Sequence, residues 1–535
     1  KIRLKMNITT FDFKDIPQFS DTDKAYTLGD KSLRPFYEHE VSLEAFERVI
    51  AQKNFEGTKR QILVEELERQ YKGVAASQAT LDNIQQLKEA NCYTIITAHQ
   101  PNLFTGPLYS IYKIISTINL VEKLRKHYPE QAFVPIFWTG GEDHDFEEVN
   151  HLNLFGKRIT WEDQQGGSVG AYSVDSLRSV LDQTKAVLGN GEHGKLAAEK
   201  LEAFYGNAST YSEAVKHFLN WIFGRYGLVI ANAGTAGFKR QMIPLFKDEL
   251  LNQSSKKIIA QTIQDLEAAG YQQQAHARDI NLFYLSPNKR SRIVKEGNQY
   301  EVLDTNLRFS EAEILEDLAT NPQNFSPNVV LRPLFQETIF PNLGYIGGGG
   351  EIAYWLERKT QFEHYQVPFP MLIRRCSVLW IPKGMTKLMA KLNLRAKQLF
   401  EDPHQLSKQY VLDNTEEALS LQDELTALNT VFEQIMTKAK RVDPALEPGV
   451  LGQQKQMQKA VEKVEQRLLR SEKKKNETSL QQIQKLKDTL FPKNGLQERS
   501  DNFLGFYSRY GNVFLDTLKA NLDVLDKKML VIEDE

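Results

Sequence analysis

The stretch that decides the fold is Tyr93-Thr-Ile-Ile-Thr-Ala98, which runs directly into the polar turn His99-Gln-Pro-Asn-Leu-Phe-Thr-Gly106. Its apolar and β-branched residues predict a buried strand. Pro107 is expected to open a helix, because a proline in the first helical position lacks only an N–H that would have no partner there. Residues 133–138 predict the next strand, although Pro135 counts against an interior place, since proline cannot donate to the ladder. This strand–helix–strand order is typical of a right-handed parallel crossover.

The same alternation continues along the chain. Residues 228–231 predict another buried strand, and Pro244 is expected to open another helix. Farther on we expect a glycine-rich loop at 344–350, a helix over 351–362 and a strand over 371–374. The alternation predicts an α/β fold with a Rossmann-like parallel sheet that helices cover on both faces.

Two regions, about 155–225 and 255–325, interrupt this alternation, and we interpret them as insertions. Residues 1–90 are expected to be mostly helical, since apolar residues recur at helical spacing within 41–68. A chain of 535 residues is long enough for several domains. Residues 1–380 are therefore predicted to form a Rossmann-like catalytic core with connecting insertions.

Beyond residue 380 the composition changes. Apolar residues step by three and four along 425–446 and again along 457–468, which is the seam of a coiled coil. Two such helices around a break predict a long antiparallel α-helical coiled-coil hairpin over 381–496. Residues 497–535 are expected to be a C-terminal helical segment that returns to the core. The residues expected to break the helix between the two seams are Pro444, Pro448 and Gly449.

The apolar seams of the two helices can be covered in two ways. Long helical arms can pair with a second copy of the chain, which predicts a homodimer made through about residues 385–495. The alternative is an intramolecular hairpin that packs only on its own seam.

Composition excludes several classes of function. The 67 basic residues nearly balance the 69 acidic ones, so no nucleic-acid partner is expected. With only Cys92 and Cys376, neither a disulfide framework nor a cysteine-based metal site is predicted. No apolar run reaches the ~20 residues that span a bilayer, and the first residues do not resemble a signal peptide. We therefore expect a cytoplasmic protein with no membrane partner.

The polar turn after the first strand is a candidate anion site. A helix that begins after a strand offers free N–H groups and the positive end of its dipole. His99 can add a hydrogen bond or a positive charge to a phosphate. The alternative is a plain tight turn that Thr105 caps. The candidate residues are His99, Gln100, Asn102, Thr105, Gly106 and Tyr109.

Titratable groups gather after the second strand, in Gly140-Gly-Glu-Asp-His-Asp145 and the residues that follow. Clustered carboxylates can hold an ammonium group or raise one another's pKa. His144 and His151 would share a face of a helix, but carboxylates in a first helical turn also serve as plain caps, so no metal is predicted. We interpret the segment as an amine site. Its candidate catalytic residues are Asp143, His144 and Asp145, and its binding residues are Glu142, Asn150 and His151.

A third polar segment surrounds Arg332 and the run Gly347–Gly350. Glycines let backbone N–H groups approach a ligand closely, and an arginine offers a fork for a carboxylate or a phosphate. The alternatives are a structural ion pair and a flexible turn. The chain has neither the P-loop pattern nor the dinucleotide fingerprint. The candidate residues are Arg332, Gln336, Gly347, Gly348, Gly349, Glu351 and Tyr354.

Taken in order, these segments resemble the BshC cysteine ligases of bacillithiol synthesis, and the resemblance covers nearly the whole chain. The stretches that carry it are His99-Gln-Pro-Asn-Leu-Phe-Thr-Gly-Pro-Leu-Tyr109, Phe137-Trp138, Gly141-Glu-Asp-His-Asp145, Asn150-His151, Ser326-Pro-Asn328, Leu331-Arg-Pro-Leu334, Gly349-Gly-Glu-Ile-Ala-Tyr-Trp355 and Gln497-Glu-Arg499.

The resemblance implies a Rossmann core related to class I aminoacyl-tRNA synthetases and nucleotidyltransferases. It also implies a reaction, the joining of cysteine to glucosaminyl malate through an amide as the last step of bacillithiol biosynthesis. ATP is the expected cosubstrate, because the cysteine carboxylate must be activated. The chain departs from the synthetase pattern, since Asn102 replaces the second histidine of H-x-G-H and Lys383-Gly-Met-Thr-Lys387 only loosely resembles K-M-S-K-S.

These motifs suggest roles for the individual residues. We expect His99 and Asn102 to contact a phosphate or the leaving group, and Arg332 with the glycine run to hold the malate or a phosphate. The three residues Asp143, His144 and Asp145 are expected to handle the amine or its proton. Two alternatives remain at this point: nucleotidyl transfer to another small acceptor, and a non-enzymatic coiled-coil scaffold.

Overall fold

The computed structural model describes residues 5–415 and 420–535. They fall into two compact units. The core unit consists of Ile8–Leu379 with Gln497–Val531, and the hairpin unit consists mainly of Trp380–Leu496, with short pieces from both ends of the chain. Each unit is described by itself.

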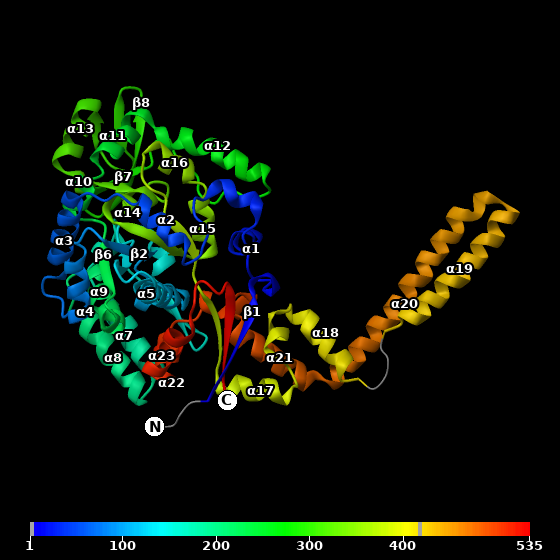
Figure 1. Cartoon of the computed structure of the whole chain (residues 1–535). Helices are drawn as coiled ribbons and strands as arrows, with labels where there is room; N and C mark the ends of the chain where they lie inside the picture. Colours follow the sequence, from blue (N-terminus) through cyan, green and yellow to red (C-terminus); the bar gives the residue numbers. More distant parts are fainter. Residues whose placement is uncertain (1–4, 416–419) are drawn as a thin grey trace. The chain divides into compact units, whose positions relative to one another are not determined.

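A five-stranded parallel sheet forms the centre of the core unit, and it confirms the predicted Rossmann-like class (Figure 1). Four of its strands lie where the sequence predicts them, and nearly all their residues are buried. In spatial order the strands are β13 (Met371–Arg374), β12 (Asn342–Gly347), β2 (Cys92–His99), β3 (Ala132–Thr139) and β6 (Val229–Asn232).

Strand β3 lies inside the sheet, with β2 on one side and β6 on the other. The prediction that Pro135 disfavours an interior strand is therefore wrong. Strand β6 pairs with β3 only from Ile136 onward. At Pro135 the strand therefore has a neighbour on one side only, where it lies opposite Ile95 of β2. The missing N–H of proline is tolerated there because one side has no ladder to interrupt.

The expected crossover helix is α5 (Tyr109–His127), which connects β2 to β3. A short 3-10 turn at Leu103–Thr105 precedes it, with φ of 46° at Phe104 and 74° at Thr105. Helix α11 (Ile243–Asn252) begins next to Pro244, as predicted.

The expected glycine-rich loop at 344–350 is wrong, because most of it belongs to regular elements. Strand β12 extends to Gly347, and α15 (Gly349–Leu356) begins two residues later. A Cβ added to Gly344 would lie 3.0 Å from a methyl group of Ile373, so this glycine makes room for neighbouring strands. The helix expected over 351–362 is likewise two helices, α15 and α16 (Lys359–His364).

Both predicted insertions have structures of their own. A hairpin of β4 (His151–Leu154) and β5 (Lys157–Thr160) spans the start of the first insertion, and three helices follow. The second contains an antiparallel sheet in the order β10-β9-β8-β7-β11. Figure 1 shows its strands β7 (Leu282–Ser286) and β8 (Lys289–Glu296) near α11 and α13 (Glu311–Thr320). The remaining elements of the insertions are α7 (Arg178–Leu188), α8 (Glu192–Tyr205), α9 (Tyr211–Phe223), α12 (Ser254–Ala268), β9 (Gln299–Val302), β10 (Arg308–Ser310) and β11 (Phe325–Pro327).

The sequence did not predict a further three-stranded sheet, which has the order β1-β15-β14. Its strands are β1 (Met6–Asp12), β14 (Ser377–Ile381) and β15 (Lys528–Asp534). The last corrects the helical reading of 497–535, which holds only for α22 (Leu504–Tyr510) and α23 (Asn512–Asn521). The predicted helices of the first 90 residues are present as α1 (Asp21–Leu28), α2 (Ala45–Gln52), α3 (Gly57–Tyr71) and α4 (Gln78–Gln86).

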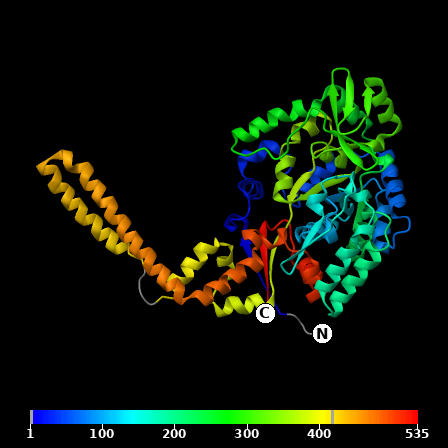
Figure 2. The same ribbon diagram turned by 180° about the vertical axis from the view of Figure 1, so that it is seen from behind.

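The hairpin unit contains the predicted antiparallel pair, α19 (Gln422–Val442) and α20 (Glu447–Lys475), which lie side by side in both views (Figures 1 and 2). The break between them is the short 3-10 turn Pro444–Leu446, whereas Pro448 and Gly449 lie in the first turn of α20. The other helices of the unit are α17 (Lys383–Lys391), α18 (Pro403–Asp413) and α21 (Glu477–Leu490). Lys383-Gly-Met-Thr-Lys387 forms the first residues of α17.

Neither α19 nor α20 contains a buried residue. Gln454 and Gln458 on α20 both donate to Asn429 Oδ1 on α19, at 3.0 and 2.7 Å. Seam residues such as Val442 (81% exposed) and Val464 (47%) remain open to solvent. Among the described residues, no helix is both long and apolar enough to cross a membrane.

Candidate active site

A cavity of about 730 Å³ lies at the carboxyl ends of the parallel strands, in the size range of small-molecule sites. Its wall contains residues from all three polar segments that the sequence singles out. The predicted residues that line it are His99, Gln100, Tyr109, Glu142, Asp143, His144, Arg332, Gly348, Gly349, Glu351 and Tyr354.

The other predicted residues do not line this cavity. Three of them support residues that do: Asn102 lies 3.4 Å from the His99 ring, Gln336 accepts a bond from Arg332, and the Gly347 carbonyl accepts one from the Arg375 backbone. Thr105 and Gly106 belong to the turn before α5, where the Gly106 carbonyl accepts a bond from Asn502. The remaining three are Asp145, Asn150 and His151.

His144 and His151 do not share a helical face. The only helix between them, α6, is the single turn Phe146–Val149, and His151 begins β4, where its ring contacts Asn150. No group of three or more potential metal ligands occurs within the described ranges.

The carboxylate of Glu351, in the first turn of α15, has hydrogen-bond partners on both of its oxygens. Both its oxygens accept from Lys113 Nζ, at 2.8 and 2.7 Å, and further bonds come from the Tyr345 hydroxyl and the Gly348 N–H. Burial by itself would raise the pKa of Glu351, but Lys113 and the other donors lower it to about 2. This carboxylate is therefore ionised, and its acceptor sites are occupied by the protein.

The His99 imidazole lies beside this ion pair. Burial and the nearby Lys113 charge lower the pKa of His99 to about 3, so the ring is neutral at physiological pH. The Tyr109 ring meets it edge-on, with centroids 5.2 Å apart. The sequence suggested that His99 gives a ligand either a hydrogen bond or a positive charge. A neutral ring can supply the hydrogen bond but not the charge.

The acidic turn after β3 presents Asp143 to the cavity. One Asp143 oxygen accepts from Gln100 Nε2 at 2.7 Å, and the other accepts from the His144 N–H at 2.7 Å. Partial burial opposes ionisation, but the His144 side chain, Gln100 and the charge of Arg290 outweigh it, so the pKa of Asp143 lies well below its usual value. Asp143 is therefore an anion suited to binding an ammonium group.

Glu142 in the same turn has a structural partner. The buried Lys239 ammonium lies 2.7 Å from one of its oxygens, and the Ser326 hydroxyl donates to the other at 2.8 Å. The bonds from Lys239 and Ser326 attach the turn to neighbouring segments of the core unit.

Arg332 is the cation that the sequence predicts to bind a carboxylate or a phosphate. Its guanidinium donates to the Tyr354 hydroxyl at 2.6 Å and to Gln336 at 3.1 Å. It also lies over the Tyr345 ring, 5.5 Å from the centroid. Both hydrogen-bond partners are uncharged, so the positive charge of Arg332 is available to an anionic ligand.

Sequence reasoning missed several residues of the wall. Arg290 and Phe283 come from the second insertion, and no local pattern marks them. Arg375 directly follows a predicted strand, so its position at a strand end was a usable signal. Arg499 belongs to the motif Gln497-Glu-Arg499 that supports the family resemblance, but no binding or catalytic role was predicted for it. Lys113, which holds Glu351, lies on α5 without any sign in the sequence of its buried partner.

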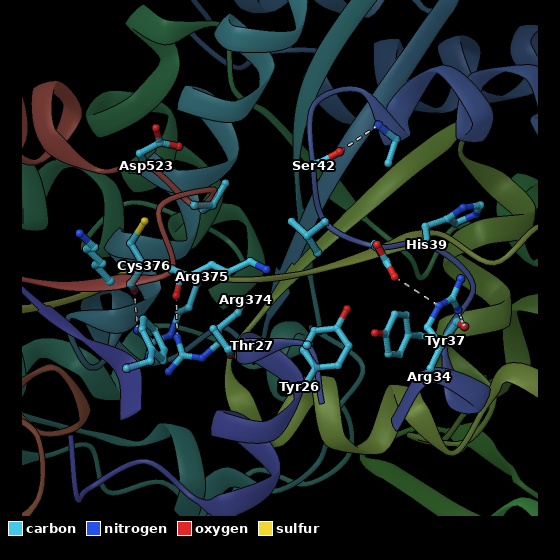
Figure 3. A pocket seen from close by; sticks show the side chains of 18 of the residues that line it. Tyr26, Thr27, Arg34, Tyr37, His39, Ser42, Arg374, Arg375, Cys376 and Asp523 are labelled. Atoms are coloured by element: carbon cyan, nitrogen blue, oxygen red, sulfur yellow. Dashed lines mark hydrogen bonds and ion pairs between the residues drawn. The ribbon is translucent and has the colours of Figure 1, made fainter. Parts of the chain in front are cut away.

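A second cavity of about 450 Å³ lies elsewhere in the core unit (Figure 3). None of the predicted site residues is in its wall, although Arg375 lines both cavities. Arg374 donates to both Asp23 oxygens there, at 2.8 and 3.0 Å. Figure 3 shows Arg34, Tyr37 and His39 on one side of the view and Arg374, Arg375 and Cys376 on the other.

Cys376 lines this second cavity, whereas Cys92 begins strand β2, and neither forms a disulfide. Burial raises the pKa of each thiol to about 12. Neither cysteine is therefore a nucleophile at physiological pH.

A parallel Rossmann-like sheet with a cavity at its carboxyl edge, lined by both ionised carboxylates and arginines, defines an enzyme class that acts on small charged substrates. Two family models specify the class further. "Bacillithiol biosynthesis BshC, N-terminal Rossmann-like domain" matches residues 6–376, and "Bacillithiol biosynthesis BshC, C-terminal coiled-coil domain" matches residues 378–533. The chain belongs to the BshC family of bacillithiol biosynthesis.

Relatives named "Putative cysteine ligase BshC" match along almost the whole chain. The protein from Flavobacterium psychrophilum is 40% identical over 94% of this chain and 94% of its own length. The one from Flavobacterium johnsoniae is 39% identical over 96% and 97%, respectively. A solved structure titled as an arginyl-tRNA synthetase from Campylobacter jejuni covers 84% of this chain and 99% of its own at 10% identity, but its TM-score of 0.22 does not establish a shared fold.

Proposed function

We propose that this chain is a cysteine ligase that joins cysteine to glucosaminyl malate through an amide bond, as the last step of bacillithiol biosynthesis. The observation that carries the proposal is that Asp143 and Arg332 line one cavity. The site thus offers an anion to an amine and a cation to a carboxylate or phosphate. Family membership favours this ligase over nucleotidyl transfer to another acceptor and over a non-enzymatic scaffold.

The charge of each cavity residue suggests which part of the substrates it binds. Asp143 has a lowered pKa, so it holds the sugar ammonium and does not itself take up the proton. The neutral His99 offers hydrogen bonds to the leaving group. Arg332, together with Arg499, provides positive charge for the malate carboxylates or a phosphate, whereas the Arg375 charge is already paired with Glu498.

We propose ATP as the cosubstrate. A free carboxylate is a poor electrophile, so the cysteine carboxylate must be activated before the amine attacks it. Transfer of AMP to that carboxylate releases pyrophosphate. The bound ammonium first loses a proton to solvent or a basic group. Attack by the resulting amine then forms the amide, releases AMP and leaves a second proton to be taken up in the same way. The arginines of the wall, Arg332 and Arg499 among them, suit the phosphate charge of such a substrate.

A homodimer and a cytoplasmic location complete the proposal. The exposed seam residues of α19 and α20 support the dimer, because a single hairpin leaves them in water. Light scattering on the full chain, and on a chain with 439–468 replaced by a short Gly/Ser linker, tests it. We expect a dimer and then a monomer, and a monomer in both cases contradicts the dimer.

The ligase activity is tested by quantifying the thiol product by mass spectrometry. The reaction contains the chain, cysteine, glucosaminyl malate and ATP, and each small molecule is left out in turn. We expect the amide product only in the complete mixture, with AMP and pyrophosphate in equal amounts. Product without ATP contradicts the proposed cosubstrate, and no product in the complete mixture contradicts the ligase itself.

A further inference from the structure

Arg290 reaches the cavity from the antiparallel insertion, and its head group is held on several sides. Nε donates to the Ser326 hydroxyl at 3.1 Å, and Nη2 donates to the Pro327 carbonyl at 3.1 Å. The guanidinium carbon lies 3.9 Å from the centroid of the Phe283 ring. With a side chain only 7% exposed, Arg290 has a fixed orientation.

The remaining guanidinium nitrogen, Nη1, lies 2.9 Å from Nδ1 of His144. A guanidinium can only donate hydrogen bonds, so Nδ1 must be the acceptor and cannot carry a proton. A neutral imidazole carries a single N–H, which must then be on Nε2. The Phe283 ring, 5.3 Å from the imidazole centroid, packs against the same side chain.

Asp143 is the competing partner of the same ring nitrogen. Its Oδ1 lies 3.6 Å from His144 Nδ1, beyond hydrogen-bond distance, and already accepts from the His144 backbone N–H at 2.7 Å. An imidazole protonated at Nδ1 would direct that N–H toward the Arg290 guanidinium, which lies closer. The observed distances therefore favour Arg290 as the partner and the Nε2–H tautomer as the form present.

We propose that Arg290 is a positioning residue that holds His144 as its Nε2–H tautomer, so that His144 serves the cavity as a hydrogen-bond donor and not as a base. The side chain of His144 lines the cavity and is 46% exposed, so Nε2–H can reach a ligand oxygen. In the proposed ligase reaction, on which this role rests, that oxygen is the acyl or phosphoryl oxygen that gains negative charge.

This role also gives the second insertion a function. Arg290 and Phe283 lie on adjacent strands of its sheet, and Ser326 and Pro327 lie on β11 of the same sheet. The four residues that fix the guanidinium or the imidazole thus belong to one structural element. The second insertion thus determines which ring nitrogen of His144 carries the proton.

The tautomer is measured directly by NMR. Protein labelled with ¹⁵N in its 10 histidines gives long-range ¹H–¹⁵N correlations, and the His144→Gln variant identifies the signals of His144. At pH 7.5 we expect a protonated Nε2 and an unprotonated Nδ1 in the unmodified chain. Arg290→Met should convert this into a mixture of tautomers, whereas Arg292→Met, an exposed arginine of the same strand, should not.

An Nδ1–H tautomer or an imidazolium in the unmodified chain overturns the proposal, even if Arg290→Met fails to fold. This measurement needs no substrate. If the tautomer is as expected but no ligase product forms, the proposed function fails and the Arg290–His144 arrangement stands. If product forms and Nδ1 carries the proton, only the role of Arg290 fails.

Kinetics test whether the donor matters. The amide nitrogen of glutamine can replace Nε2–H, so His144→Gln should lose about tenfold or less in turnover, whereas His144→Leu should lose about 100-fold. Glutamine cannot take up a proton at this position. Equal and large losses in both variants would therefore show that His144 acts as a base and would overturn its role as a donor.

Discussion

Glu351 and Asp143 are both ionised carboxylates at the same cavity, but the protein uses them differently. Glu351 accepts from a buried ammonium, a tyrosine hydroxyl and a backbone N–H. Asp143 accepts from an amide side chain and a backbone N–H, and its closest cation, Arg290, is 3.8 Å away. Their side chains are 26% and 36% exposed. The comparison indicates that Glu351 supports the site, whereas the charge of Asp143 is left for the substrate.

Removing Lys113 should give the largest effect. Lys113→Met leaves the Glu351 charge without its closest partner, and breaking a buried ion pair costs about 3–5 kcal/mol. We expect the free energy of unfolding, measured in urea, to fall by at least about 3 kcal/mol. The double variant Lys113→Met/Glu351→Gln should recover much of this loss. A loss below about 1 kcal/mol in the single variant would show that the pair does not stabilise the site.

His99→Ala should mainly affect turnover. His99 lies at the end of β2 and is neutral, so its removal deletes a hydrogen-bonding group and leaves the Lys113–Glu351 pair in place. Loss of one preorganised donor typically lowers turnover about 10²–10³-fold. Product assays and circular dichroism on the same sample separate chemistry from folding. Near-normal turnover in a folded variant would remove His99 from the site.

Asp143→Asn tests the other carboxylate. Asparagine keeps the shape and most hydrogen bonds but removes the charge, so we expect turnover to fall about 100-fold. The free energy of unfolding should change by about 1 kcal/mol or less. Asp145→Asn is the matched control, because Asp145 is close in sequence but does not line the cavity. A change in unfolding with unchanged turnover would make Asp143 a structural cap.

The smallest effect concerns pH. The pKa of His99 falls from an ordinary value of 6.5 to about 3 on folding, so the unfolded chain binds the extra proton first. The contribution of His99 to the free energy of unfolding is fully present above pH 6.5, where the ring is neutral in both states. It is lost as the pH falls toward 3, because the unfolded chain takes up the proton first. Within this window His99→Gln should reduce the slope of unfolding free energy against pH by up to about 1.4 kcal/mol per unit. An unchanged slope in urea titrations would contradict a neutral His99 in the folded chain.

The parts of the site that the sequence predicted are those encoded locally. A buried strand, a polar turn and a helix follow one another in residues 93–126, so His99 and Tyr109 could be placed at a strand end. The same holds for Asp143 after β3. Parallel strands bring these turns to one edge, and proximity in the fold then follows from the topology.

What the sequence did not show depends on contacts between distant segments. Arg290 meets His144 from 146 positions away, and Lys113 meets Glu351 from 238 positions away. Strands β1 and β15 pair from near the two ends of the chain, which no local periodicity reveals. The glycine run was misread because glycines that make room inside a sheet look the same in sequence as those of a flexible loop.

The two buried cysteines have a consequence for redox chemistry. A thiol with a pKa of about 12 is a thiolate in only about 10⁻⁵–10⁻⁴ of molecules near neutral pH, and thiol–disulfide exchange requires the thiolate. The folded chain therefore forms no mixed disulfide with oxidised cysteine at any useful rate. Oxidation of the cellular thiol pool would deplete the proposed substrate without modifying the protein that consumes it. Thiol-reactive dyes should label the chain only after it unfolds.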